Sequence, residues 1–472
     1  MSNISEILLK SEHCKILKIA GEVGDALNVN TYLVGGYVRD IILGNKLKDI
    51  DIMVEDRVFE YSKKLSKKLN VNKTVEFEKF LTVKIPYSVC EIEVANARQE
   101  TYDKDSRKPK TVELTTVEND LIRRDFKINS IASSLNNKNF GLLVDPFNGL
   151  VDINKGLIDT PTDPDTTFID DPLRMLRAIR FSAQLEFKMH PRIMKSIKDN
   201  KERIKIISQE RITDEIIKIL RSNKPSIAFY FLKELDFLKL IFPELDIMSG
   251  VEVINNMGHK DVFIHTLEVV DNAARLSNKM EIRFAALVHD IAKPPTKRFD
   301  KKKGWTFHGH EEIGRRMLVK IAKRMKISND LRDYLMILTK LHLRPIALAK
   351  KEISDSAVRR VMFEAGDFID DLMILCRADI TTKNPNKIKK YMNNFERVDM
   401  LMKNVKMKDE MKAFQSPVGG KEIMKTFSLT EGKIVGQIKK AIENAILDEE
   451  IPNTYDDAYK YMIKIKDEFI KN

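Results

Sequence analysis

The chain has 472 residues, which is too long for one ordinary domain, and its 43% hydrophobic and 32% charged residues are typical of a globular protein with several cores. The formal net charge of +12 favours a polyanionic partner such as RNA or DNA, although a general lysine bias would give the same charge. Three widely spaced cysteines exclude a disulfide framework and a cysteine-ligated zinc site, and we find neither a signal peptide nor an apolar run long enough for a membrane span, so we expect a cytoplasmic protein.

The first part of the chain mixes strand and helix patterns. Residues 57–69 predict an amphipathic helix, and the polar, Lys/Arg-rich segment 102–117 predicts a loop. Apolar or alternating runs predict strands at residues 31–34, 49–54, 81–85 and 90–95. These elements indicate a small α+β head.

After about Pro161 the strand patterns stop and helical periodicity continues almost to the end, as in Leu173–Leu185 and Thr213–Leu220. Proline and glycine residues near 225, 243 and 250–258 mark joints. We therefore predict an all-helical body behind the head. The predicted division is 1–155, 156–250, 251–384 and 385–472, the last part being a Lys-rich tail.

The segment Val34–Asp51 (VGGYVRDIILGNKLKDID) contains the first group of candidate site residues. Gly35 and Gly36 follow a predicted strand, where their backbone N–H groups can approach a phosphate closely and the next helix adds a favourable dipole. Arg39 lies in the first turn and can pair with a phosphate. Without further residues, such a glycine pair is most often only a tight turn.

Asp49 and Asp51 alternate on a predicted strand and should share one face, with Ile50 and Ile52 turned to the core. Two neighbouring carboxylates repel each other unless cations neutralise them, and a pair of Mg²⁺ ions does so. Two such ions suit an in-line attack on a nucleotide α-phosphate. The alternative is a solvated strand edge, which the glycines and the arginine just upstream disfavour. Glu93 in the later strand CEIEV is a third candidate ligand, with a solvated face as its alternative.

The motifs GGYVRD and DID resemble the signature of the bacterial-type CCA-adding enzyme and poly(A) polymerase family, within the polymerase-β-like nucleotidyltransferases. Further blocks follow in family order: RRDFKINSIA at 123–132, DPFNGLVD at 145–152, DDPLRMLRAIRF at 170–181 and ERITDEIIKIL at 210–220. The resemblance implies that these blocks bind the ribose, join head and neck, select the nucleotide and brace the selecting helix, respectively. Lys127 departs from the family, which usually has Thr there.

The resemblance also implies the roles of individual residues. Asp49 and Asp51, with Glu93, would be catalytic, and the two aspartates would hold Mg²⁺. Nucleotide binding would fall to Gly35, Gly36, Arg39, Arg123, Arg124, Asp125, Asn129, Asp171, Arg174, Arg177 and Arg180. The implied fold is a polymerase-β-like head with a mixed sheet, followed by an all-α body.

The residues Asp171, Arg174, Arg177 and Arg180 recur every three positions and predict a stripe on one side of a helix. A surface salt-bridge stripe is the plain interpretation. The alternative is a protein template, because an Asp acceptor beside an Arg donor matches the base-pairing edges of both cytosine and adenine. Uracil and guanine invert that pattern and would leave buried polar groups unpaired, at about 1–3 kcal/mol each. The resemblance gives the template role to Asp171 and Arg174.

A second candidate site lies in residues 251–384, where six of the eight histidines occur between His259 and His342. The series His265, then the adjacent pair His289-Asp290, then Asp379 is similar to that of the HD superfamily of metal-dependent phosphohydrolases. The similarity implies that these four residues ligate one divalent metal of unknown identity. The remaining candidates, for a second metal or for gripping phosphate, are His308, His310 and His342. A degenerate domain that only holds tRNA is the alternative.

The favoured function is addition of the 3′-terminal CCA of tRNA from CTP and ATP, with neck and basic tail binding the tRNA and no protein partner required. Alternatives with the same chemistry are a poly(A) polymerase and an enzyme adding only CC or only A. The basic loop Asp105–Pro109 (DSRKP) favours a complete enzyme, because CC-only relatives tend to lack it. Two further alternatives are a protein acting mainly as an HD phosphohydrolase and a non-catalytic RNA-binding protein. The intact acid pair of Asp49 and Asp51 argues against both of these alternatives.

Overall fold

The computed structural model describes residues 2–102, 109–254, 257–258, 260–349, 353–413, 416–448 and 450–470. The chain divides into two compact units, Met1–Leu343 with Asp367–Ile388, and Arg344–Gly366 with Lys389–Asn472. Both candidate sites lie within the first unit. In the described part of the chain, no helix combines the length and the apolar character needed to cross a membrane.

The head is built on a seven-stranded sheet with the order β3-β4-β5-β2-β1-β8-β9. The strands are β1 (Thr31–Val34), β2 (Ile50–Val54), β3 (Val75–Phe77), β4 (Thr82–Tyr87), β5 (Cys90–Asn96), β8 (Ala132–Ser134) and β9 (Leu143–Val144). Only β2 and β5 pair in parallel, and the other neighbours are antiparallel. The predicted mixed sheet is therefore confirmed.

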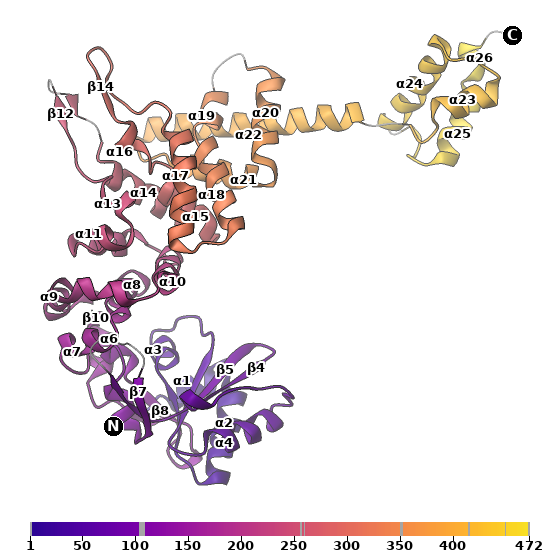
Figure 1. The fold of residues 1–472 in the computed structure, drawn as a ribbon. Helices are drawn as coiled ribbons and strands as arrows, with labels where there is room; N and C mark the ends of the chain where they lie inside the picture. Colours follow the sequence, from indigo (N-terminus) through magenta and orange to yellow (C-terminus); the bar gives the residue numbers. More distant parts are fainter. Residues whose placement is uncertain are drawn as a thin grey trace. The chain divides into compact units, whose positions relative to one another are not determined.

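Helices α2 (Cys14–Leu27) and α4 (Val58–Lys68) lie side by side against the sheet (Figure 1). The buried Tyr61 hydroxyl of α4 donates to the carbonyl of Ala20 at 2.8 Å and fixes the two helices together. The predicted amphipathic helix at residues 57–69 is thus confirmed. The remaining head helices are α1 (Ser5–Lys10), α3 (Gly36–Ile42), α5 (Val117–Ile122) and α6 (Gly149–Lys155).

The loop predicted at residues 102–117 was wrong in part. Strands β6 (Arg98–Tyr102) and β7 (Pro109–Leu114) pair antiparallel, and α5 then starts at Val117. Backbone hydrogen bonds form such a ladder whatever the polarity of the side chains, so polarity alone does not distinguish a solvated strand from a loop. Proline is tolerated at the first position of a strand, where Pro109 lies. Residues 105–108 of the DSRKP segment lie outside the described residues.

The body is helical, as predicted. In the first unit its helices are α7 (Pro164–Asp170), α8 (Leu173–Gln184), α9 (Pro191–Asn200), α10 (Gln209–Leu220), α11 (Ser226–Glu234), α12 (Leu238–Ile241), α13 (Pro243–Asp246), α14 (Val262–Leu276), α15 (Met280–Val288), α16 (Lys293–Thr296), α17 (His310–Met325), α18 (Asn329–Leu341) and α21 (Ile369–Ala378). The expectation that strands end near Pro161 was wrong for three short pairs. They are β10 (Leu157–Ile158) with β11 (Lys188–Met189), β12 (Val253–Ile254) with β13 (Met257–Gly258), and β14 (Arg298–Asp300) with β15 (Gly304–Thr306). Runs of two or three residues are too short to show a period of two.

The second unit is all-helical in its described residues. Its helices are α19 (Arg344–Leu348), α20 (Asp355–Ala365), α23 (Gly420–Phe427), α24 (Lys433–Leu447), α25 (Tyr455–Lys464) and α26 (Lys466–Phe469), and α22 (Pro385–Ala413) begins in the first unit. The last four helices share a core around Ile423, Ile438, Ile442 and Met462.

Candidate active site

The turn between β1 and α3 forms one wall of the main cavity. Gly35 has φ = 69° and ψ = −131°, a conformation that favours glycine. A Cβ at this position would lie 3.0 Å from Nη1 of Arg124 and 3.9 Å from Oδ2 of Asp51. Glycine therefore lets the backbone approach these two side chains, whereas the contact with a phosphate that the sequence suggests stays a prediction.

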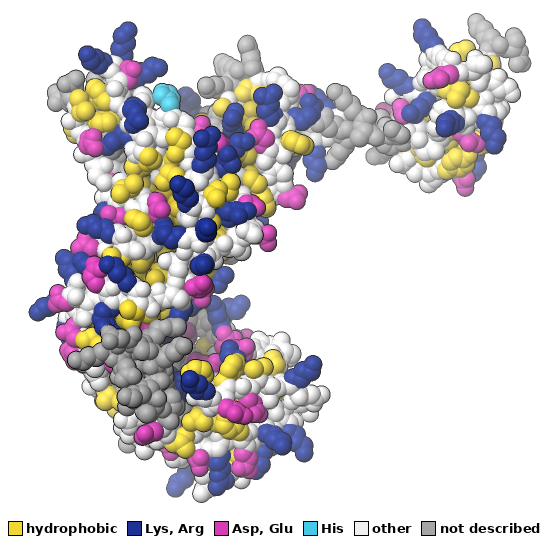
Figure 2. Space-filling view, viewed as in Figure 1, with side chains coloured by type: hydrophobic (Ala, Val, Ile, Leu, Met, Phe, Trp, Pro, Cys, Tyr) yellow, Lys and Arg dark blue, Asp and Glu magenta, His cyan; other side chains and the backbone are white. Residues whose placement is uncertain are grey.

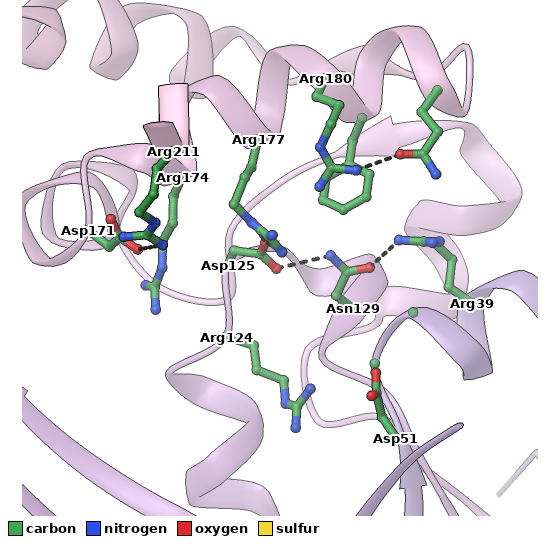
Figure 3. A pocket seen from close by; sticks show the side chains of 14 residues that line it. Arg39, Asp51, Arg124, Asp125, Asn129, Asp171, Arg174, Arg177, Arg180 and Arg211 are labelled. Atoms are coloured by element: carbon green, nitrogen blue, oxygen red, sulfur yellow. Dashed lines mark hydrogen bonds and ion pairs between the residues drawn. The ribbon is translucent and has the colours of Figure 1, made fainter. Parts of the chain in front are cut away.

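Of the predicted acid pair, Asp51 lies in β2 and Asp49 lies just before that strand. Ile50 and Ile52 are buried, as predicted, and Asp51 lines the cavity together with Arg124 (Figure 3). Burial raises the pKa of the Asp51 carboxyl to about 6, with further increases from the negative charges of Glu93 and Asp49. A carboxyl in such a place is poised to bind a cation, because a cation would replace the missing solvation.

The three head acids are close to one another without forming a tight cluster. Asp51 and Glu93 are partners in the parallel register of β2 and β5. Asp49 is exposed just before β2 and accepts the N–H of Glu91 at 3.4 Å, and Lys84 lies 3.8 Å from Glu93. Among the described residues, only two groups in the HD region bring three potential metal ligands within 4.8 Å. Mutual repulsion explains the wider spacing of the head acids.

The carboxylate of Asp120 on α5 was missed by the sequence interpretation. It is 1% exposed and binds both arginines of the RRDF block, Arg123 at 2.5 Å and Arg124 at 2.9 Å. Burial would raise the pKa of Asp120, but the positive charges of Arg124 and Arg123 outweigh it, so the pKa is lowered. Asp120 therefore holds Arg124 at the cavity beside Asp51. The signal available in the sequence was an acid that lies three residues before an arginine pair on a short helix.

Replacing Asp120 with Asn should destabilise the protein and impair nucleotide addition together. Two half-buried guanidinium groups would lose the buried carboxylate that they share, which costs about 3 kcal/mol of unfolding free energy. Denaturant unfolding and single-turnover addition rates measure the two effects. The matched control is Glu118→Gln, an exposed acid on the same helix. Equal stability and activity of the two variants would contradict this positioning role.

The α7–α8 junction differs from the prediction. Asp171 is not on the helix that carries Arg174, because α7 ends at Asp170 and α8 begins at Leu173. Pro172 disfavours a helical conformation of the residue before it, and Asp171 is extended with φ = −139° and ψ = 101°. Its Oδ1 accepts the N–H of Leu173 at 3.1 Å, and its Oδ2 lies 3.8 Å from Arg211 of α10. Arg174 donates to the carbonyl of Arg123 at 2.7 Å.

The predicted stripe is therefore a helical row of three arginines with Asp171 beside it. Arg177 binds Asp125, whose Oδ1 accepts from Asn129, and Asn129 in turn accepts from Arg39 at 2.7 Å (Figure 3). Burial would raise the pKa of Asp125, but Arg177 outweighs it and the pKa falls to about 2. These residues form a rigid polar floor.

Arg180 has a structural partner that confirms the bracing role expected of α10. Its Nε donates to the buried Glu215 of α10 at 2.6 Å. Its guanidinium also lies 4.0 Å from the ring centroid of Phe181. The ring of Phe181 is also approached by Arg39 at 5.1 Å and Arg177 at 5.5 Å, so it separates three cations. Neither Phe181 nor Glu215 was a predicted site residue.

These elements enclose a cavity of about 450 Å³ between head and neck. Its lining contains Gly35, Gly36, Arg39, Asp51, Arg124, Asp125, Asn129, Asp171, Arg174, Arg177, Arg180, Phe181, Gln184 and Arg211. Of the predicted nucleotide-binding residues, only Arg123 is outside this lining. It lines an adjoining cavity of about 200 Å³ with Asp51 and Glu93. The volume and the excess of guanidinium groups suit a nucleoside triphosphate.

Lys127 faces away from this cavity. Its Nζ lies 2.7 Å from Asp159 and 3.9 Å from Asp152. Asp159 also pairs with Arg192 of α9 at 2.7 Å. The lysine thus takes part in an ion-pair network that joins head and neck, and it is not among the residues that line the cavity.

The HD region forms a separate polar centre, which we call the HD centre: His265, His289, Asp290 and Asp379. His265 lies on α14, His289 and Asp290 follow α15, and Asp379 follows α21. The Nε2 atoms of His265 and His289 lie 3.0 and 3.7 Å from Oδ1 of Asp379. The four predicted ligands are therefore brought together, mostly at helix ends.

A second group of three shares Asp290. Its Oδ1 lies 3.3 Å from Nε2 of His310 and 3.8 Å from Nε2 of His342, and those two nitrogens are 3.3 Å apart. The third candidate, His308, is exposed and belongs to neither group. Of the three histidines predicted to support the metal site, His310 and His342 therefore lie in the second group and His308 does not.

The hydrogen bonds of these rings fit a metal site. Nδ1 of His289, His310 and His342 each lies 2.6–2.8 Å from a backbone carbonyl, so Nδ1 donates its proton and Nε2 presents a lone pair to the centre. Burial lowers the pKa of His342 to about 4, which keeps that ring neutral. Buried Nε2 of His289, Oδ1 of Asp290 and Oδ1 of Asp379 have no hydrogen-bond partner, and Oδ2 of Asp290 lies 2.6 Å from Nζ of Lys293. A divalent cation would satisfy all of these atoms.

Comparison with known proteins agrees with this architecture. Three family models match the chain: the poly A polymerase head domain at residues 31–159, the probable RNA and SrmB-binding site of polymerase A at 186–248, and the HD domain at 262–383. The protein is thus a nucleotidyltransferase of the poly(A) polymerase head class, joined to an HD domain.

A multifunctional CCA protein of Shewanella frigidimarina is 32% identical over 368 residues, which cover 74% of this chain and 83% of that protein. The chain belongs to this family of multifunctional CCA proteins. A similar protein of Psychromonas ingrahamii is 33% identical over 66% of this chain and 74% of its own length. A solved CCA-adding enzyme in an apo form shares the fold, with a TM-score of 0.60 and 22% identity over 98% of this chain and 99% of that one.

Proposed function

We propose that this protein adds or repairs the 3′-terminal CCA of tRNA, using CTP and ATP without a nucleic-acid template. The observation that carries the proposal is the shared cavity, because Asp51 on the head and the pair Asp171 and Arg174 on the neck line the same space of about 450 Å³. A triphosphate held there can present its base to the neck and its α-phosphate to the head. Family membership supports the same function.

Asp49 and Asp51 would hold Mg²⁺, with Glu93 as the third carboxylate. Bound Mg²⁺ would make the attacking 3′-hydroxyl a better nucleophile and stabilise the leaving pyrophosphate. The raised pKa of Asp51 and the parallel register of Asp51 and Glu93 support this ligand set. Arg124, anchored by Asp120, would bind the triphosphate beside these acids.

Nucleotide choice would depend on Asp171 and Arg174. Cytosine and adenine each present an amino donor next to a ring-nitrogen acceptor, which match the Asp acceptor and the Arg donor. In this structure the two side chains are held by Leu173 N–H and by the carbonyl of Arg123. Both residues flank the start of α8. The Arg177–Asp125–Asn129 network forms the floor of the cavity beside them.

Arg174→Ala should reduce discrimination more than it reduces the chemical step. The penalty that excludes uracil and guanine should shrink by about 1–3 kcal/mol, or roughly 5- to 150-fold in selectivity. The measurement is kcat/KM for all four nucleoside triphosphates, on tRNA lacking CCA and on tRNA ending in CC.

The matched control is Arg221→Ala, an exposed arginine just after α10. This control should leave the nucleotide preferences unchanged. If the arginine row were only a surface salt-bridge network, Arg174→Ala would also leave them unchanged and would cost only about 0–1 kcal/mol of stability. An unaltered CTP:UTP and ATP:GTP preference in the Arg174 variant would refute the template role.

We also propose a second activity, in which the HD centre hydrolyses 2′,3′-cyclic phosphates or 2′-phosphomonoesters. Its residues His265, His289, Asp290 and Asp379 would hold a divalent metal of unknown identity, which would supply an activated water. Water adds to phosphorus while one phosphorus–oxygen bond breaks. A 2′,3′-cyclic phosphate then becomes a monoester with one free hydroxyl, and a 2′-monoester becomes inorganic phosphate and a free 2′-hydroxyl. The convergence of three buried lone-pair donors that lack a hydrogen-bond partner, on His289, Asp290 and Asp379, supports this function over a purely structural domain.

The division of labour that we propose follows the predicted parts: 1–155 catalysis, 156–250 nucleotide selection, 251–384 hydrolysis and 385–472 tRNA binding. Backbone phosphates would be the main tRNA contacts, since the chain carries a formal charge of +12 and A-form helices hide their major-groove edges. The cytoplasm, where tRNA and nucleoside triphosphates occur, would be the site of action.

A further inference from the structure

The β14–β15 hairpin is the most basic protruding element beside the HD centre. Between residues 293 and 308 there are six lysines or arginines and a single acid, Asp300. Asp300 accepts the backbone N–H groups of Lys302 and Lys303, both at 2.8 Å, so its charge serves to form the turn. The side chains of Lys301, Lys302 and Lys303 are exposed, and Figure 2 shows Lys and Arg side chains gathered at this end of the molecule.

The base of this hairpin lies next to the HD centre. The carbonyl of Phe307, just after β15, accepts the Nδ1 proton of His310 at 2.7 Å. Lys293 lies 2.6 Å from Oδ2 of Asp290, and its Nζ is 5.7 Å from the ring centroid of Phe307. A phosphate bound at the HD centre would therefore have Lys293 and the Phe307 ring as immediate neighbours.

Aromatic rings and cations alternate along the same hairpin. Trp305 packs edge-on against Phe299 at 5.3 Å, and Nζ of Lys297 lies 4.9 Å from the centroid of its indole. Glu252 holds Lys297 at 2.6 Å. Cations beside partly exposed aromatic faces are how single-stranded nucleic acid is bound, phosphates to the cations and bases to the rings.

The length of the hairpin exceeds what a mononucleotide requires. Phe307 at the base lies four positions along the chain from Lys303 at the tip, which is roughly 13 Å of extended chain. A single nucleotide with its phosphate at the HD centre would meet Phe307 and Lys293 without approaching the tip. A strand of several nucleotides would run along the whole hairpin.

We propose that the β14–β15 hairpin is an RNA-binding arm of the HD centre, so that the HD centre acts on a phosphate at the end of an RNA strand. The effect of this arm on catalysis rests on the proposed phosphohydrolase function. The binding itself is independent of hydrolysis. The tip lysines contact backbone phosphates, the Trp305 and Phe307 rings contact bases, and Lys293 contacts the terminal phosphate.

Trp305 makes a direct test feasible, because it is the only tryptophan of the chain. The full-length protein is titrated with a single-stranded RNA twelve-mer that ends in a 2′,3′-cyclic phosphate, and Trp305 fluorescence is recorded. The fluorescence should change saturably. The triple variant Lys301→Ala, Lys302→Ala, Lys303→Ala should raise the RNA concentration at the midpoint of the titration at least tenfold. The charge-matched control, Lys63→Ala, Lys64→Ala, Lys67→Ala on α4 of the head, should shift it less than twofold.

Hydrolysis provides the second readout. With the tip variant, KM for the RNA end should rise about tenfold, whereas kcat/KM for a 2′,3′-cyclic mononucleotide should stay within twofold of wild type. If no substrate is hydrolysed but the tip-dependent fluorescence change persists, the arm stands and the phosphohydrolase function fails. Fluorescence that is insensitive to RNA, equal weakening by both triple variants, or an equal response to polyphosphate would overturn the RNA-binding arm.

Discussion

Asp51→Ala should reduce nucleotide addition by at least roughly 10⁴-fold, equivalent to about 5.5 kcal/mol of transition-state stabilisation. Of the three candidate metal-binding acids, Asp51 is the one that lines the nucleotide cavity, and its removal would leave Asp49 and Glu93 as an incomplete cation site. Asp49→Ala should have a comparable effect. Both variants should fold normally and keep their affinity for tRNA, since Asp49 is exposed and Asp51 is a half-buried carboxyl whose raised pKa means that its charge contributes little to stability.

Single-turnover addition and tRNA binding are measured side by side to separate chemistry from binding. The control is Asp56→Ala, an exposed acid that follows the same strand. Protons compete with cations for Asp51, and the pKa of this carboxyl is raised to about 6. The Mg²⁺ concentration for half-maximal addition should therefore rise as the pH falls below about 6. Wild-type addition by either acid variant would eliminate this site assignment.

The second large effect is expected at the HD centre, where His265→Ala or Asp290→Ala should abolish hydrolysis of 2′,3′-cyclic nucleotides and leave CCA addition within twofold of wild type. Each variant removes a donor from the cluster around Asp379 and Asp290. His265 is more exposed than the fully buried Asp290, so its variant is the safer one for folding.

Thermal unfolding with and without Mg²⁺, Mn²⁺, Ni²⁺ and Co²⁺ reports metal binding independently of activity. A bound ion should raise the melting temperature of wild type and of His308→Ala, whose side chain is outside both groups, but not of His265→Ala. Wild-type protein that neither gains stability nor hydrolyses with any of these metals would leave the domain with a structural role. Loss of CCA addition in His265→Ala would contradict the separation of the two sites.

Much of the head site could be predicted because its residues lie close together in the sequence. Gly35, Arg39 and Asp51 are within seventeen residues of one another, and a strand period of two places Asp51 opposite Ile50 and Ile52. The mixed sheet and the helical body followed from the same periodicities. The HD ligands are far apart in sequence and were found by resemblance, since no local period relates His265 to Asp379.

Other features were missed or misplaced although part of the signal was local. Asp120 precedes Arg123 and Arg124 by three and four residues, so its ion pairs could have been predicted from the spacing alone. Asp171 was expected on the helix of Arg174, but it lies before Pro172 and outside that helix, and both side chains line the same cavity. The ion pairs of Lys127 with Asp159 explain a departure from the family that the sequence left open.

The most direct test of the central claim is to sequence the 3′ ends that the purified protein makes on tRNA lacking CCA, with each nucleoside triphosphate alone and with all four together. A cavity that joins Asp51 to the selecting pair Asp171 and Arg174 should add C residues from CTP alone, and exactly C, C and then A from the mixture. UTP and GTP should not be used appreciably. A long A tail, addition of only CC or only A, or no addition at all would contradict the account.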